Sequence, residues 1–142
     1  MIGCVVLNYN DYKTTTDFVL RVKEMKSIDL IVVVDNYSTD DSFHQLQALE
    51  SEKVHVIQSS KNGGYGYGNN VGIEYLKGKV DYILIANPDV EFEESVVLKM
   101  VHAFDLDTAI VAPLTLQPDK TRQLPEAWMV PTLKDYFLFS SK

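Results

Sequence analysis

Apolar residues gather into short continuous runs that are separated by polar segments along most of the chain. Five runs have the length of strands, and they lie at residues 2–7, 30–34, 54–57, 82–86 and 108–112. Their apolar residues are continuous rather than alternating, which is typical of strands that are buried on both faces of a parallel sheet. The pattern therefore predicts a buried parallel sheet.

The segments between these runs carry apolar residues at helical spacing. Residues 12–25 and 93–104 each predict an amphipathic helix, and residues 43–49 predict a shorter one. The glycine-rich segment 62–72 runs into a further helix that ends near Gly78. Strands that alternate with helices predict an α/β fold with a mostly parallel sheet flanked by helices.

The length of 142 residues and the hydrophobic fraction of 46% suit one globular domain. We expect a core sheet over residues 1–113. The turn signal at 117–120 predicts a hairpin over residues 114–123, and the aromatic run at 136–139 needs a surface to pack against. We interpret residues 114–142 as the start of an acceptor-side region in a domain that is truncated at its C-terminus.

Charge and cysteine content narrow the class of protein. The net charge of -7 argues against binding nucleic acid through a basic face, although a divalent cation could still mask the phosphates of a nucleotide. Cys4 is the single cysteine, and its place in an apolar run predicts a small buried side chain. The chain has no basic leader and no apolar run near the roughly 20 residues of a spanning helix. These features predict a cytoplasmic protein.

Polar residues and glycines follow the predicted strands where each strand ends. Four strand ends carry them: Asn8 and Asn10, Asp35 and Asn36, the glycine-rich segment 62–72, and Asn87-Pro88-Asp89. Right-handed crossovers place such ends along one edge of the sheet, and ligands of open α/β sheets bind at that edge. The sequence therefore predicts one ligand site.

Two familiar nucleotide signatures do not fit the glycine-rich segment. In Gly-x-Gly-x-x-Gly the third glycine would fall at Asn69 or Val71. Gly63 and Gly68 have the spacing of a P-loop, but asparagines replace the Lys-Ser/Thr pair that follows. A zinc site is also not indicated, because the three histidines are scattered.

Four segments resemble, in order and rough spacing, the motifs of family 2 glycosyltransferases. They are VVLNYN at 5–10, the segment 34–40 as an Asp-Asp/Asn-x-Ser-x-Asp motif, the segment 62–72 as an Asn-x-Gly-aromatic-x-x-Gly-Asn-Asn-x-Gly loop, and Asn87-Pro88-Asp89 in the place of Asp-x-Asp. The resemblance implies a GT-A (Rossmann-like) sheet flanked by helices, with a C-terminal hairpin or extension. The Asp-Asn and Asn-Pro-Asp forms, with residues 122–131, look most like the bacterial rhamnosyltransferase branch.

The resemblance also implies a site for a nucleoside-diphosphate sugar with Mg²⁺ or Mn²⁺. Asp89 would be the metal ligand, and Asn87 would be a weaker ligand or a contact to the ribose. Asn36 would bond the imide edge of a pyrimidine, since an amide can donate and accept there. Tyr65 and Tyr67 suit either packing or stacking. The implied donor-binding residues are Asn8, Asn10, Asp35, Asn36, Gly64, Gly68, Asn69, Asn70 and Asn87.

The activity that the resemblance implies is inverting transfer, with a donor such as dTDP-rhamnose, to a glycan or lipid-linked glycan acceptor, as in bacterial surface polysaccharide synthesis. It allows a peripheral membrane association of the full-length protein at the inner face of the membrane. Inverting transfer needs a general base, and we identify no catalytic residue before Lys142. The base is therefore expected beyond Lys142, and the chain alone is expected to transfer sugar poorly.

Three alternatives to a sugar-transferring enzyme remain open. A non-catalytic nucleotide-sugar-binding module would bind donor and metal without transfer. A sugar-1-phosphate nucleotidyltransferase has a related sheet but carries a Gly-rich basic loop after its first strand, where this chain has NYND at 8–11. A pure interaction domain would show no stabilisation by nucleotides.

Overall fold

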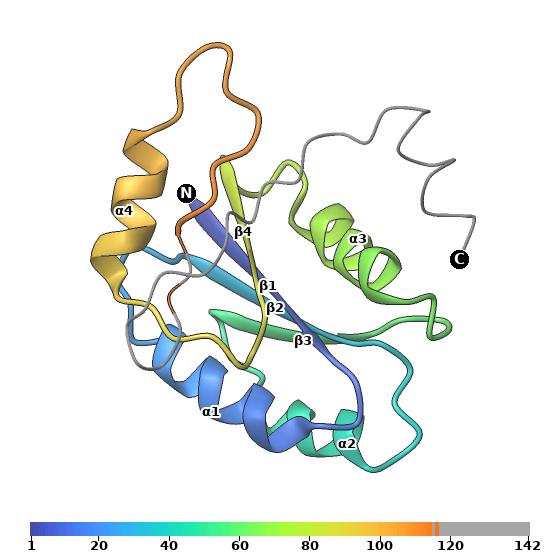
Figure 1. Cartoon of the computed structure of the whole chain (residues 1–142). Coiled ribbons are helices and arrows are strands. Elements are labelled where there is room, and N and C mark those ends of the chain that lie inside the picture. The colour runs from blue at the N-terminus through green and yellow to red at the C-terminus, as the bar shows by residue number, and fades with distance from the viewer. Residues whose placement is uncertain (115, 117–142) are drawn as a thin grey trace, which may run out of the picture. The chain divides into compact units, whose positions relative to one another are not determined.

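A parallel sheet of four strands forms the centre of the structure, a computed structural model that describes residues 1–114 and 116 (Figure 1). The strands stand in the order β3-β2-β1-β4, and they are β1 (Ile2–Asn8), β2 (Leu30–Asp35), β3 (Val54–Gln58) and β4 (Tyr82–Ala86). Every pair of neighbours is parallel, with Asn8 level with Asp35 and Asp35 level with Gln58. The predicted parallel sheet is confirmed.

Helices connect the strands. They are α1 (Tyr12–Val22), α2 (Ser42–Leu46) with the 3₁₀ turn η1 (Gln47–Leu49), α3 (Tyr65–Leu76) and α4 (Glu94–His102). In Figure 1, α1 lies on one face of the sheet and α3 on the other. All these elements belong to one compact unit, Met1–His102, while Ala103–Lys142 forms a second unit.

The core has two layers, one on each face of the sheet. Alternate residues of β1 point to opposite faces, so Cys4 packs with Phe18 of α1 while Val5 packs with Leu76 of α3. Both Cys4 and Val5 are fully buried, which explains the continuous apolar run. β1 and β2 are therefore buried on both faces, as predicted.

The fourth strand is less buried than its sequence predicts. Ile85 is 45% exposed, and residues 82–84 are half-buried. The prediction of burial on both faces is wrong for β4, because within the described residues this strand pairs with β1 alone and forms an edge of the sheet.

The predicted strand at residues 108–112 is absent from the structure. Ile110 is 86% exposed, and no described strand pairs with this segment. A β-branched run takes up a strand conformation when it pairs with another strand, and no such pairing of this segment occurs within the described residues. The predicted hairpin, apart from Leu114 and Leu116, and the segments 122–131 and 136–139 lie outside the described residues.

Candidate functional site

The direction in which successive strands are added to the sheet reverses at β1, so that β4 lies on the side of β1 opposite to β2. From β1 the chain passes through α1 to β2 and on to β3, whereas β4 returns to the other side of β1 after α3 on the opposite face. Such a reversal leaves a crevice outside the carboxyl ends of the two strands, where ligands of open α/β sheets bind. Asn8 ends β1 and Asn87 follows β4, so both lie at the edge of the sheet where this crevice is expected.

Asp35 sits at the carboxyl end of β2 and is fully buried. Its Oδ1 accepts hydrogen bonds from Asn8 Nδ2 at 2.9 Å and from the Ser38 hydroxyl. Its Oδ2 accepts from the Ser38 backbone N–H and from Gln58 Nε2, both at 3.0 Å. Since a buried carboxylate is tolerated when donors surround it, this network holds the ends of β1, β2 and β3 together.

Asn8 is 1% exposed, and both polar atoms of its amide are hydrogen-bonded. Nδ2 donates to Asp35 and, at 3.2 Å, to the Ser38 hydroxyl, while Oδ1 accepts from Thr15 Oγ1 at 2.9 Å. The side chain therefore ties β1 to β2 and to α1, and it supports the crevice from within the protein.

Asn36 is also buried and connects β2 to the glycine-rich loop. Its Nδ2 donates to Asn62 Oδ1 at 3.1 Å and to the Gly64 carbonyl at 3.3 Å, and its Oδ1 accepts from Ser59 Oγ at 3.3 Å. In this arrangement the amide that was predicted to read a pyrimidine holds the loop in place.

The loop after β1 is fastened to the loop after β2 by Asn10. Its Oδ1 accepts from the Thr39 N–H at 2.8 Å, and its Nδ2 donates to Thr39 Oγ1 at 3.1 Å. Asn10 has a φ of 54°, and Tyr37 has a φ of 63°. A bulky residue in this region is an outlier of the kind that clusters at functional sites, and the exposed Tyr37 carries no sequence signal that could have revealed it.

The glycines of the glycine-rich segment 62–72 have different structural roles. Gly64 precedes α3 with a φ of 85°, which is the left-handed region that favours glycine. A Cβ at Gly68 would lie 2.3 Å from Leu7 Cδ1, so Gly68 lets α3 pack closely on β1. A Cβ at Gly66 would meet nothing within 4 Å, so this side of the helix start is open.

Asn69 presents an unpartnered buried oxygen near the start of α3. The residue is 4% exposed, and its Nδ2 donates to the Tyr65 carbonyl at 3.0 Å. Its Oδ1 has no hydrogen-bond partner among the described residues, and such an orphan typically destabilises a protein by about 1–3 kcal/mol. A ligand donor could satisfy it. The neighbouring Asn70 is exposed.

The turn after β4 faces solvent. Asn87 and Asp89 are exposed, and the Val90 N–H closes the turn on the Asn87 carbonyl at 3.3 Å. Tyr65 Oη donates to Asn87 Oδ1 at 2.8 Å. No group of three metal-ligating side chains occurs in the described part of the chain. One free carboxylate suits Mg²⁺ or Mn²⁺, because such ions are held by one or two carboxylates with phosphate oxygens and waters.

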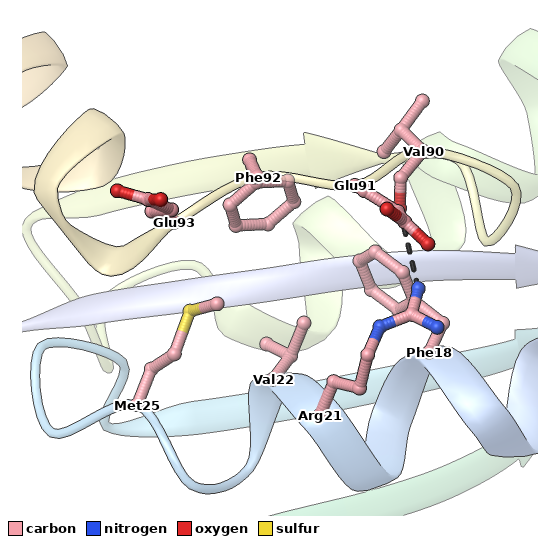
Figure 2. A pocket seen from close by; sticks show the side chains of 8 residues that line it. All are labelled: Phe18, Arg21, Val22, Met25, Val90, Glu91, Phe92 and Glu93. Carbon is pink, nitrogen blue, oxygen red and sulfur yellow. Dashed lines mark hydrogen bonds between the residues drawn. The ribbon is translucent and has the colours of Figure 1, made fainter. Parts of the chain in front are cut away.

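A separate hollow of about 330 Å³ lies between α1 and the segment that follows Asp89 (Figure 2). Its lining residues are Phe18, Arg21, Val22, Met25, Val90, Glu91, Phe92 and Glu93. Arg21 Nη2 donates to the Val90 carbonyl at 3.4 Å, and the rings of Phe18 and Phe92 meet edge-on at 5.9 Å. These contacts anchor the turn that carries Asp89 against α1. None of the predicted donor-binding residues lines the hollow.

A parallel sheet with helices on both faces and a reversal of strand order is typical of open nucleotide-binding α/β folds, of which GT-A is one. A solved mannosyltransferase PcManGT from Pyrobaculum calidifontis, in complex with GDP-Man and Mn²⁺, matches it with a TM-score of 0.64 and 16% identity, over 83% of this chain and 36% of that one. The family model described as glycosyl transferase family 2 matches residues 4–138. The chain therefore belongs to glycosyltransferase family 2, as its motifs predict.

Two curated relatives agree with this assignment. The low-salt glycan biosynthesis hexosyltransferase Agl10 of Haloferax volcanii is 30% identical over 95 residues, which are 66% of this chain and 29% of that protein. The dTDP-rhamnosyl transferase RfbF of Shigella flexneri is 28% identical over 127 residues, which are 87% of this chain and 42% of that protein. The chain thus spans less than half the length of either relative. Within the described residues, no helix has the length and hydrophobicity that a bilayer crossing requires.

Proposed function

We propose that this chain is the donor-binding part of an inverting glycosyltransferase. It binds a nucleoside-diphosphate sugar with Mg²⁺ or Mn²⁺, and the complete protein transfers the sugar to a glycan or lipid-linked glycan acceptor. The observation that carries the proposal is the hydrogen bond from Tyr65, the first residue of α3, to Asn87, which brings the turn with the exposed Asp89 to the open start of this helix. The unpartnered Asn69 oxygen belongs to the same helix, four residues further on.

The polar groups at the crevice suit the parts of such a donor. The N-terminus of α3 offers backbone N–H groups and a positive dipole end, which favour a diphosphate. The open side at Gly66 leaves room for a ligand to approach the backbone. Asp89 would hold the metal, which when bound supplies positive charge to the leaving diphosphate.

The buried asparagines and Asp35 have a supporting role in this proposal. Asn8, Asp35 and Asn36 already hydrogen-bond to one another or to the loops, so they fix the strand ends that surround the donor. Asn10 holds the loop after β1 against the loop after β2. The predicted ribose and base contacts would then come from backbone groups and from side chains at the rim of the crevice.

The identity of the donor sugar rests on similarity. The relative of Shigella flexneri is named as a dTDP-rhamnosyl transferase, which supports dTDP-rhamnose as the donor to test first. With this function we expect a cytoplasmic location at the inner face of the membrane. The family match favours sugar transfer over a sugar-1-phosphate nucleotidyltransferase. A non-catalytic binding module would differ in showing no transfer even as the complete protein.

A thermal-shift panel of dTDP, UDP and GDP with and without Mn²⁺ tests the proposal. One nucleotide at about 100 times its dissociation constant should add about 2.7 kcal/mol of stability. Asp89→Asn should remove the part that depends on Mn²⁺, whereas Glu91→Gln, which changes a nearby exposed carboxylate, should not. Indifference of the wild-type chain to all three nucleotides would contradict the proposal and favour an interaction domain.

A further inference from the structure

One hydrogen bond joins the start of α3 to the turn after β4 at the mouth of the crevice. The phenol of Tyr65 donates to Asn87 Oδ1 at 2.8 Å, across 22 positions of sequence. Tyr65 is the first residue of α3 and is 57% exposed, so burial alone does not hold it there. The contact therefore gives the ring a role other than packing.

This contact decides which atoms of the Asn87 amide are available to a ligand. An amide carries one carbonyl oxygen and one NH₂ group, which donates two hydrogen bonds. The oxygen already accepts from Tyr65, whereas the NH₂ group has no hydrogen-bond partner among the described residues. A cation that approached the second lone pair of Oδ1 would lie beside the positive end of the phenol O–H dipole. The environment thus favours an anionic or hydroxyl oxygen at the NH₂ group.

Asp89 provides the contrast within the same turn. Its carboxylate is exposed and has no hydrogen-bond partner within the described residues. A carboxylate at position 87 could accept from Tyr65 with one oxygen and ligate a cation with the other, but a neutral amide has only the one oxygen. The turn therefore offers one anionic oxygen donor for a metal and one NH₂ group.

We propose that Tyr65 is a positioning residue, whose hydroxyl fixes the Asn87 amide so that its NH₂ group can donate to an oxygen of the nucleoside-diphosphate sugar. Asn87 then acts as a hydrogen-bond donor and not as a metal ligand, and Asp89 remains the expected metal ligand of this turn. This inference rests on the proposed function. It replaces the two roles left open for Asn87 by one, and it gives the Tyr65 hydroxyl a task in donor binding.

Calorimetric titration of dTDP into the wild-type chain and its variants tests the inference, once with EDTA and once with Mn²⁺. Asn87→Ala should weaken dTDP binding by about five- to tenfold under both conditions, which is the effect of one hydrogen bond. Tyr65→Phe should weaken it by a similar or smaller factor, again without regard to Mn²⁺. The double variant should bind no more weakly than Asn87→Ala, because Tyr65 acts through the amide.

Two control variants separate this role from other effects. Tyr67→Phe removes a hydroxyl from the same helix that contacts Ser60 Oγ at 2.9 Å and not Asn87, so it should leave dTDP binding unchanged. Asp89→Asn should abolish the gain in affinity that Mn²⁺ provides. Urea unfolding of Tyr65→Phe should stay within about 0.5 kcal/mol of wild type, as expected for an exposed contact.

The outcomes distinguish this inference from the proposed function. If the wild-type chain binds no nucleoside diphosphate, the proposed function fails and this inference fails with it. If the wild-type chain binds but Asn87→Ala loses the Mn²⁺-dependent gain as Asp89→Asn does, Asn87 is a metal ligand and the inference alone is wrong. It is equally overturned if Tyr65→Phe binds dTDP as tightly as wild type under both conditions.

Discussion

The carboxyl ends of β1 and β2 carry the same residue types as the turn after β4, but the two regions use them in opposite ways. Asp35 is fully buried and its two oxygens accept from Asn8, Ser38 and Gln58. Asp89 is exposed and accepts from no described residue. An aspartate at a strand end is thus part of the scaffold in one region and a solvent-exposed group without a protein partner in the other.

The position of each strand in the sheet explains the difference. β1 and β2 each have a neighbour on both sides, and helices cover both of their faces, so polar groups at their ends are enclosed and must find protein partners. β4 is an edge strand within the described residues, and the turn after it is enclosed far less. We call the ends of β1 and β2 the closed half of the site and the 87–89 turn the open half.

Asp35→Ala should have the largest effect on stability. The change leaves the donors of Asn8, Ser38 and Gln58 without their acceptor in a buried place, and we expect a loss of about 3 kcal/mol or more. Urea unfolding of the purified chain measures it.

Asp89→Ala is the matched control from the open half. Because its carboxylate has no partner within the described residues, its removal should change the free energy of unfolding by less than about 0.5 kcal/mol. Equal losses for the two variants would show that the division into a closed and an open half is wrong.

Two glycines of helix α3 allow the same comparison between an enclosed and an open position. A Cβ at Gly72 would lie 2.5 Å from Val5 Cγ1, and Val5 is fully buried, so Gly72→Ala should overpack the core and destabilise the chain by about 1–3 kcal/mol. Gly66→Ala, where a Cβ meets nothing within 4 Å, should instead stabilise the helix by about 0.5–1 kcal/mol. Thermal unfolding of the two variants gives the sign of each effect, and a stabilising Gly72→Ala would contradict the packing described.

Sequence patterns predicted the elements of the closed half because its strands are continuous apolar runs. They failed at residues 108–112 and at the burial of β4, since both depend on neighbouring strands that a local pattern does not reveal. Topology also predicted that the polar strand ends share one edge. It could not separate Asp35 from Asp89, because partners such as Asn8 lie 27 positions away in sequence.

The contacts that shape the open half carried no sequence signal at all. The bond from Tyr65 to Asn87 joins side chains from two elements, and its geometry depends on how α3 packs on the sheet through Gly68 and Gly72. Position and packing in space, rather than residue type, thus decide which polar groups are left for a ligand.

The Cys4 thiol reports on the buried core beside β1 at alkaline pH. Burial raises the pKa of Cys4 to about 12, above the usual value of 9.0. The folded state therefore keeps its proton where the unfolded state loses it, so this contribution is present below about pH 9 and is lost as the pH rises toward 12. The free energy of unfolding should therefore fall by up to about 1.4 kcal/mol per pH unit above pH 9.

Cys4→Ala supplies the control for this slope. The variant lacks the thiol, so the pH dependence specific to Cys4 should disappear while that of other groups remains. Parallel curves for wild type and variant, measured by urea unfolding between about pH 8 and pH 10.5, would show that the thiol ionises freely in the folded chain.

The smallest effect is expected where the open half is fastened to the rest of the unit. The carboxylate of Glu94, at the start of α4, accepts a hydrogen bond from the Ser27 N–H, and this bond lowers the pKa of Glu94 below its usual 4.5. A group whose pKa is lowered by folding stabilises the folded state at pH values above its unfolded pKa, and this contribution is lost as the pH falls below about 4.5.

Glu94→Gln keeps an acceptor oxygen but removes the charge, so it should be slightly less stable than wild type at neutral pH and equal to it in acid. Glu93→Gln, whose carboxylate contacts Ser95 at the hydrogen-bond limit of 3.5 Å, should show a smaller difference. If the gap between Glu94→Gln and wild type stays constant from neutral pH to acid, charge on Glu94 does not hold the segment after Asp89, and the contacts of Phe92 and Val90 with α1 must anchor it instead.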